Sequence, residues 1–227
     1  MVSQLSHTHA AEHETAGQFA YKAVIRDICN LNWGQLSGDD LIDVAWAYYY
    51  FSTQFRENLE IALDLFPDDE LLHELDRGER NTDNLSPWPG VAAPGERLNH
   101  EEFMRRTLTL TPVPEARRRS LEALGQSYLA TVRGVDKMSR ALSLPAYEEG
   151  GLESVFRAIL TAPVWDCALL GAFKHFLEGH VALDSDAESG HGALCRHLVP
   201  DDQILPLWTA FRQILVEAAP ALSRSKA

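Results

Sequence analysis

The sequence predicts an all-α protein, a bundle of seven to nine helices that forms a single domain over residues 1–227. Apolar residues recur at helical spacing along most of the chain, and Pro and Gly cluster between these stretches. No stretch alternates apolar and polar residues as a half-buried strand does, and no internal repeat is present. With 227 residues, 45% of them hydrophobic, the chain is long enough to bury a substantial core.

The N-terminal half of the chain contains three predicted helices. Ser37 is a suitable N-cap for the second of them, because Asp39 and Asp40 follow in what would be its first turn. Pro67 ends that helix and precedes the third. These helices are expected to span residues 18–31, 41–65 and 70–81.

One long irregular segment, residues 84–98, follows these helices. Its three Pro and two Gly exclude a regular helix, and loops of this length inside compact domains often carry function. Beyond it the helical pattern returns, with breaks at Pro145 and Gly150-Gly151, and Pro206 is expected to bend the last helix. The helices predicted in this half span residues 100–110, 115–142, 152–160, 164–184, 194–197 and 200–218.

The charge balance narrows the classes of partner that the sequence allows. Asp and Glu number 33 against 20 Lys and Arg, which gives a net charge of −13 at pH 7. Proteins that bind nucleic acid or anionic membranes need a basic surface, so we expect neither partner. No apolar run approaches the roughly 18 residues that a membrane-spanning helix needs.

The N-terminus and the cysteines indicate a cytoplasmic location. Residues 1–16 are polar and rich in His, so we expect a flexible segment and not a signal peptide. The three cysteines Cys29, Cys167 and Cys195 are widely spaced, and they predict neither a disulfide framework nor a CxxC metal site.

The most specific local pattern is a late group of His and Asp residues. His180 and Asp184 are four residues apart and therefore share a helix face. An imidazole and a carboxylate together suit iron, manganese or zinc. His191 would lie about 10 Å further along an unbroken helix at ~1.5 Å per residue, so a joint site requires the helix to loosen after Asp184.

Two further groups of acids are candidates for the same chemistry. Glu79 and Asp83 are four residues apart, and two acids on one interior face repel unless a cation or a proton lies between them. His100 begins the helix after the long loop. The third group, near the Pro145 break, consists of Glu148, Glu149 and Glu153.

Each of these patterns also has an ordinary structural explanation. Acids near a helix start suit the helix dipole, and a His or an acid at a helix end is commonly solvated. Cys167 would be a candidate nucleophile, although a buried Cys on an apolar helix face is far more common.

The order of the motifs resembles the heme-oxygenase-like superfamily, which includes thiaminase-like and pyrroloquinoline-quinone-synthase-like proteins. A Tyr-rich helix at residues 48–55 is followed by Phe-Pro-Asp-Asp-Glu-Leu at residues 66–71 and then by a carboxylate-bearing helix, a His and a middle Glu. The set His180, Asp184 and His191 comes last in this order. Within that superfamily the chain is most similar to the heme-oxygenase-like diiron oxidases, also called iron-containing redox enzymes.

The resemblance covers about residues 37–218 and implies two iron ions per chain inside the bundle. In that branch one segment supplies a Glu and a His, a second supplies a Glu, and a third supplies His, Asp and His. The matching residues here are Glu79, His100, Glu148, His180, Asp184 and His191, with Asp83, Glu149 and Glu153 as alternates. Six residues separate Asp184 from His191 where the family has two, and we expect the extra turn to loop out.

The resemblance further implies a non-heme oxidase or oxygenase that uses dioxygen on a small organic substrate, and a homodimer. The aromatic residues expected to line the substrate pocket are Tyr49, Phe51, Phe55, Trp165 and Phe173, with Trp88 on the long loop as part of a lid. Two alternatives remain open. One is a cofactor-free thiaminase-like hydrolase with Cys167 as nucleophile, and the other is a helical binding protein without catalysis, whose Glu and His residues would not converge.

Overall fold

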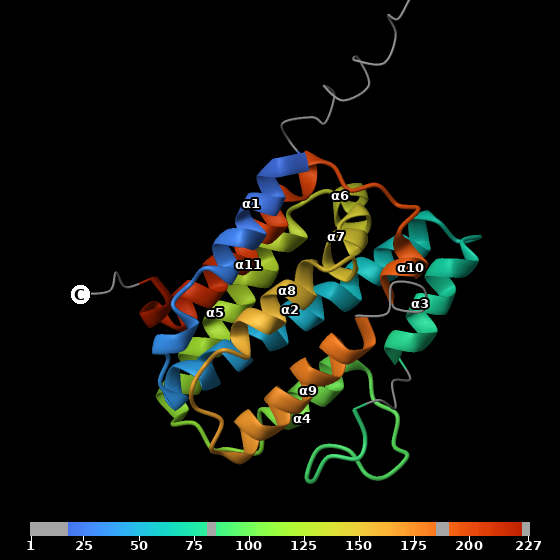
Figure 1. Cartoon of the computed structure of the whole chain (residues 1–227). Coiled ribbons are helices and arrows are strands. Elements are labelled where there is room, and N and C mark those ends of the chain that lie inside the picture. The colour runs from blue at the N-terminus through green and yellow to red at the C-terminus, as the bar shows by residue number, and fades with distance from the viewer. Residues whose placement is uncertain (1–17, 81–84, 185–190, 224–227) are drawn as a thin grey trace, which may run out of the picture.

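The computed structural model of the protein describes residues 18–80, 85–184 and 191–223, and for residues 18, 19, 183 and 184 it describes the backbone alone. These residues form eleven α-helices and no β-strand, which confirms the all-α prediction (Figure 1). The number exceeds the expected seven to nine because α6, α7 and α10 are only five or six residues long. The helices are α1 (Gln18–Cys29), α2 (Gly38–Leu65), α3 (Glu70–Arg80), α4 (His100–Thr107), α5 (Glu115–Arg133), α6 (Lys137–Leu142), α7 (Leu144–Glu148), α8 (Gly151–Ile159), α9 (Ala168–Asp184), α10 (His191–Cys195) and α11 (Leu205–Ala218).

The long helix α2 is the centre of the bundle. Its start is fixed by a capping box, in which Ser37 Oγ accepts the Asp40 backbone N–H at 3.1 Å and the Asp40 carboxylate accepts the Ser37 N–H at 3.0 Å. Along most of its length α2 is buried on more than one face, because it packs against α3, α4, α5, α6, α7, α9 and α11. These seven helices are therefore positioned by direct contact with α2.

Most of the remaining helices form three groups around α2, while α6 packs directly on α2, and α8 packs against α1, α7 and α9. Helices α1, α5 and α11 lie together on one side, and α4 runs beside α9 on another (Figure 1). The short helices α7 and α10 pack with α3 near one end of α2. The buried apolar side chains of the described residues form one continuous hydrophobic core between these groups.

Several elements differ from the predictions. Helix α7 lies across Pro145, where a break was expected, because this proline occupies the first turn of the helix. Helix α10 begins three residues before the helix expected over residues 194–197. The single helix expected over residues 115–142 is wrong: α5 ends at Arg133, and Asp136 caps a separate helix by accepting the Ser139 N–H at 2.9 Å. Pro206 does not bend the last helix, because it occupies the first turn of α11, where the missing N–H has no helical partner to lose.

The long loop is irregular from residue 85 to Asn99, as the sequence predicts, and its Trp88 packs against α9. The Trp88 ring stacks on the His175 ring of α9, with ring centroids 4.5 Å apart and planes 17° apart. His175 Nε2 also donates to the Leu85 carbonyl at 2.8 Å, and Arg106 Nη1 donates to the Val91 carbonyl at 2.9 Å. These contacts fasten the loop to α4 and α9.

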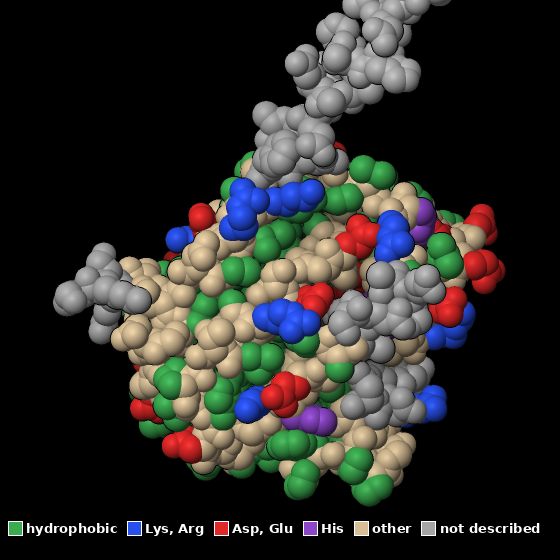
Figure 2. Space-filling view, viewed as in Figure 1, with side chains coloured by type: hydrophobic (Ala, Val, Ile, Leu, Met, Phe, Trp, Pro, Cys, Tyr) green, Lys and Arg blue, Asp and Glu red, His purple; other side chains and the backbone are tan. Residues whose placement is uncertain are grey.

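The surface mixes charges and apolar side chains. On the face shown in Figure 2, acidic and basic side chains are interspersed among hydrophobic ones. Many of the charges belong to ion pairs within one helix, such as Arg118 with Glu115 and Arg157 with Glu153. In the part of the chain that the structure describes, none of the helices is long and apolar enough to cross a membrane.

The contact between α5 and α2 depends on Gly125. A Cβ atom at this position would lie 2.0 Å from Cε2 of the buried Tyr50 ring. We expect Gly125→Ala to lower the free energy of unfolding by about 1–3 kcal/mol, because the ring and the helix must move apart. Chemical denaturation measures this change. Gly34→Ala is the control: its Cβ would meet no atom within 4 Å, and a loss as large as that at Gly125 would contradict the steric explanation.

Candidate metal centre

Five of the six residues that the sequence predicts as metal ligands lie together where five helices meet. Each comes from a different helix, and their side chains are largely shielded from solvent. They are Glu79 of α3, His100 of α4, Glu148 of α7, His180 of α9 and His191 of α10. One alternative left open by the sequence was a binding protein whose Glu and His residues would not converge. In the structure these five residues do converge.

The carboxylate of Glu79 is the centre of this cluster, because its two oxygens face different partners. Oε2 accepts from His100 Nδ1 at 2.6 Å, and Oε1 accepts from His191 Nδ1 at 2.8 Å. The same His191 nitrogen lies 3.6 Å from Glu148 Oε2. One ligand atom each from Glu79, Glu148 and His191 lie within 4.8 Å of one another, close enough to share a metal ion.

His180 completes the other side of the cluster. Its Nε2 lies 3.2 Å from His100 Nδ1. Its Nδ1 is 2.8 Å from the Phe176 carbonyl, which can only accept, so Nδ1 carries the proton and Nε2 presents a lone pair. Metal-binding histidines are commonly oriented in this way by a carbonyl behind the ring.

Local sequence features bring these side chains within reach of one another. Asn99 caps α4 by accepting the Glu102 N–H at 2.7 Å, and this places His100 at the first helical position. Gly78 precedes Glu79 on α3, and a Cβ there would lie 3.3 Å from His191 Nε2. A glycine at this position therefore lets α10 approach α3 closely enough for His191 to contact Glu79.

The charges of Glu79 and His191 stabilise each other inside the bundle. Burial alone would raise the pKa of Glu79, but the charges and hydrogen bonds of His100 and His191 hold this pKa well below its usual range. Burial also opposes protonation of His191, yet its hydrogen bonds to Glu148 and Glu79 raise its pKa to about 11. In the metal-free protein, a proton on His191 thus supplies the positive charge between two buried carboxylates.

Burial shifts the pKa values of the two remaining groups in the direction that disfavours their charged forms. Burial, together with the nearby His100, lowers the pKa of His180 to about 3. Burial raises the pKa of Glu148 more than its hydrogen bond with His191 lowers it. A neutral imidazole is the form that binds a metal, so His180 is prepared as a ligand near neutral pH.

The structure separates the predicted alternates from this cluster. Glu149 accepts from Arg196 Nε at 2.6 Å, and Glu153 accepts from Arg157 Nη2 at 2.6 Å, both at the surface. Of the three neighbouring acids, only Glu148 enters the cluster. Asp83 lies outside the described residues, as does the side chain of Asp184, whose backbone ends α9. His191 begins the short helix α10, and residues 185–190, which separate it from α9 in the sequence, lie outside the described residues.

A small inner cavity of about 20 Å³ adjoins the cluster. It is lined by Tyr48, Phe51, Ser52, Phe55, Glu79, His100, Glu148, Leu152 and His180. Of the five aromatic residues predicted to line a substrate pocket, Phe51 and Phe55 line this cavity. The cavity has room for one molecule about the size of water.

The other three predicted pocket residues lie elsewhere. Tyr49 is turned by about 100° from Tyr48 around the α2 axis and lines a separate surface groove between α2 and α5. Phe173 is fully buried in the core, with its ring centroid 5.8 Å from that of Tyr48. Trp165 packs against Phe173 and donates its Nε1–H to the Ala162 carbonyl. Among the described residues, none of these three lines the inner cavity.

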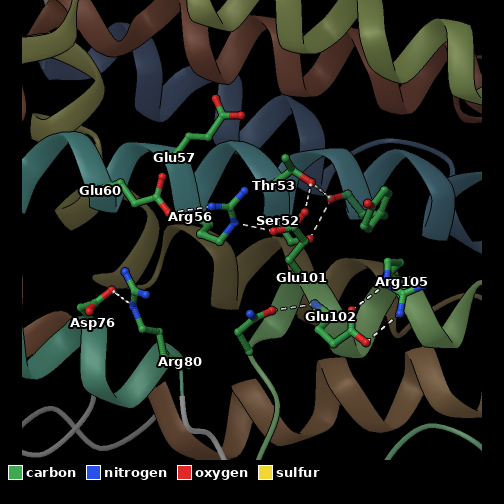
Figure 3. A network of polar contacts seen from close by, with 12 residues as sticks. Ser52, Thr53, Arg56, Glu57, Glu60, Asp76, Arg80, Glu101, Glu102 and Arg105 are labelled. Atoms are coloured by element: carbon green, nitrogen blue, oxygen red, sulfur yellow. Dashed lines mark hydrogen bonds and ion pairs between the residues drawn. The ribbon is translucent and has the colours of Figure 1, made fainter.

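A larger outer pocket of about 270 Å³ opens from the cluster towards the surface. It shares Ser52, Phe55, Glu79 and His100 with the inner cavity, so the two spaces are neighbours. Its other lining residues are Arg56, Leu59, Glu60, Asp76, Arg80, Asn99 and Glu101. Of these residues, Figure 3 shows Arg56 and Glu60 of α2, Asp76 and Arg80 of α3, and Glu101 of α4.

No family model, curated protein or solved structure matches this chain. The chemistry of the site therefore rests on its own residues. Three imidazoles and two carboxylates form a mixed nitrogen and oxygen donor set, which suits iron, manganese or zinc better than calcium or magnesium.

Several residues around this site were not predicted from the sequence, although signals for them were present. Tyr48 and Ser52 share the α2 face of Phe55, at helical spacings of seven and three residues. Arg80 directly follows Glu79, and Arg56 follows Phe55. The spacing of residues along the sequence does not show which face of α2 points towards Glu79.

The low pKa of His180 predicts how the stability of the metal-free protein depends on pH. The unfolded chain takes up a proton on this imidazole near pH 6.5, whereas the folded protein resists protonation until about pH 3. The stabilising contribution of neutral His180 is therefore complete above pH 6.5 and is lost as the pH falls towards 3.

Denaturation of the wild-type protein and of His180→Gln at several pH values tests this. The difference between their free energies of unfolding should shrink as the pH is lowered from 7 to 4. A difference that stays constant or grows over that range would contradict the assignment of a neutral, proton-resistant His180.

Proposed function

We propose that the protein is a non-heme diiron oxidase or oxygenase that acts on a small organic substrate with dioxygen. The observation that carries the proposal is the position of Glu79. One of its oxygens faces His100 and, beyond it, His180, and the other faces His191 with Glu148. A carboxylate with a separate group of donors on each side is suited to bridge two metal ions.

The donor set fits iron on the chemistry of the residues themselves. Glu79 and Glu148 would neutralise part of the metal charge inside a bundle that otherwise offers few compensating charges. His180 is held in the tautomer that presents a lone pair, and His191 would exchange its proton for the metal. Two ferrous ions at this position would supply electrons for the reduction of dioxygen.

The chain's own residues would control what reaches the site. The walls of the inner cavity include Tyr48, Phe51, Phe55 and Leu152, so little beyond one small molecule fits beside the carboxylates and imidazoles. A substrate must instead occupy the outer pocket, which borders Glu79 and His100 from the other side. This division keeps bulk water and the substrate body out of the inner cavity while the substrate lies next to the cluster.

The position of Cys167 weighs against the thiaminase-like alternative. Cys167 precedes α9 and lies 13 residues before His180, which corresponds to about 20 Å at ~1.5 Å per residue. A nucleophile at that distance from Glu79 and Glu148 has no acid or base of the cluster beside it. The convergence of five polar side chains from five helices likewise supports a metal site over a surface-binding role.

The heme-oxygenase-like placement is part of the same proposal. It is supported by the motif order along the sequence, by the all-α bundle, and by the meeting of the matched Glu and His residues from α3, α4, α7, α9 and α10.

Metal content tests the proposal directly. Protein loaded anaerobically with excess ferrous iron and desalted should retain two iron ions per chain, measured by elemental analysis. Glu79→Gln should reduce this to below one, because Glu79 contributes to both donor groups. Glu148→Gln and His180→Ala should each lose about one ion.

The neighbouring acids provide matched controls for this experiment. Glu149→Gln and Glu153→Gln remove carboxylates of the same segment that bind Arg196 and Arg157 at the surface, so iron content should not change. Less than one iron per wild-type chain, or an equal loss from Glu149→Gln and Glu148→Gln, would refute the proposed ligands.

A further inference from the structure

A further pocket, of about 340 Å³, opens at the surface between α1 and the start of α8. It is lined by side chains of α1, by residues at the end of α7 and the start of α8, and by Pro200. None of its lining residues borders the inner cavity or the outer pocket, so this space is separate from the candidate metal centre. We call it the α1–α8 pocket.

The side chains that line the α1–α8 pocket leave an excess of positive charge. Lys22 and Arg26 lie one helical turn apart on α1, and within the described residues neither has an ion pair or a hydrogen bond through its side chain. Figure 2 shows basic side chains over α1. Glu149, the acid of the lining, is neutralised by Arg196, whose Nε donates to it at 2.6 Å, and Asp27, the acid of α1, does not line the pocket.

The start of α8 adds backbone donors to the same pocket. Gly150 is the N-cap, with a φ of 83° in the left-handed region, and it has no side chain to accept from the first N–H groups of this nine-residue helix. Gly151 follows, and a Cβ there would lie 2.0 Å from the Ala146 carbonyl oxygen, so glycine is required for α8 to begin directly against α7. Both glycines line the pocket, which places the positive end of the α8 dipole at its wall.

Tyr21 supplies a further donor, and this one is buried. Its side chain is only 5% exposed and lines the pocket, yet within the described part of the chain its hydroxyl group has no hydrogen-bond partner. Burial and then the charge of Glu149 raise the pKa of Tyr21, so the hydroxyl keeps its proton. Glu149 also lines the pocket, so the hydroxyl on which its charge acts faces this space. A buried donor without an acceptor is unfavourable until a ligand or water accepts from it.

We propose that the α1–α8 pocket binds the phosphate group of a small phosphate monoester. Lys22 and Arg26 offset its negative charges, which number up to two, and the N–H groups at the start of α8 and the Tyr21 hydroxyl donate to its oxygens. A carboxylate has one charge and two oxygens, so it uses fewer of these groups. The apolar lining residues form a wall for the organic part of the ester, and they are Ile25, Pro145, Ala146 and Pro200.

A lipid headgroup is another source of phosphate. The net charge of −13 opposes the approach of the protein to an anionic bilayer, so a free ester is the better match. The inference does not depend on the proposed function, because it uses none of the metal-binding residues.

Calorimetric titration of the full-length, metal-free protein tests the inference. Phenyl phosphate, benzoate and phenol share one ring and differ in the attached group, so they separate the contribution of the phosphate from that of the organic part. We expect phenyl phosphate to bind about tenfold or more tightly than benzoate and phenol, and inorganic phosphate to compete with it. Lys22→Gln and Arg26→Gln should each weaken phenyl phosphate binding about tenfold, and Tyr21→Phe about threefold.

Lys137→Gln is the matched control. Like Lys22, Lys137 is exposed and has no ion pair among the described residues, but it begins α6 and lies outside the α1–α8 pocket. Its loss removes the same charge from the protein and should change the affinity less than about twofold. Because Lys22 and Arg26 are exposed, their Gln variants should fold normally, which the unfolding midpoint verifies.

Two further outcomes decide against the proposal. Equal affinities for phenyl phosphate and benzoate, or equal effects of Lys22→Gln, Arg26→Gln and Lys137→Gln, would overturn the phosphate site. Vesicles containing phosphatidic acid are the second probe. Co-sedimentation with these vesicles that is lost in Arg26→Gln, together with no binding of phenyl phosphate, would assign the pocket to a lipid headgroup and overturn the assignment of a free ester.

Discussion

The burial of the Glu79 carboxylate among imidazoles is the constraint on which one end of this bundle depends. A buried carboxylate is costly unless it is paired, and here each oxygen has its own partner, His100 on one side and His191 on the other. These partners lie on α4 and α10, so the pairing requires α3, α4 and α10 to meet. Helices α7 and α9 add Glu148 and His180 to the same point.

The rest of the bundle holds this costly arrangement in place. Beside the cluster lies a second buried polar network, in which Gln54 bridges the hydroxyl groups of Tyr128 and Tyr147. Its groups are satisfied, which favours a rigid and uniquely packed core. Tyr147 directly precedes Glu148 on α7, and its ring packs edge-on against Phe51 of the inner cavity. The same helix thus joins the well-packed core to the cluster.

The surroundings of the cluster divide into two spaces with different chemistry. The inner cavity is narrow and largely apolar apart from the cluster itself, and the outer pocket is larger and rimmed by ion pairs. Ser52 and Phe55 border both spaces, so α2 supplies the partition between them. Arg56, the residue after Phe55 on α2, lines only the outer pocket. The change from apolar to charged lining therefore occurs within one turn of α2.

The sequence alone determined the all-α class, most helix positions and the residue types of the site, because helical periodicity, caps and His or Glu spacing are local signals. It did not determine the break after Arg133, where Gly134 and the Asp136 cap end one helix and begin another. Nor could it choose among Glu148, Glu149 and Glu153, since all three lie within about two turns of one another. Only the tertiary structure decided that choice: α7 ends at Glu148 and points it at His191, while surface arginines pair with the other two. The same holds for Tyr49 and Phe55, whose predicted role depended on the rotation of α2 about its axis, a quantity set by the packing of its neighbours.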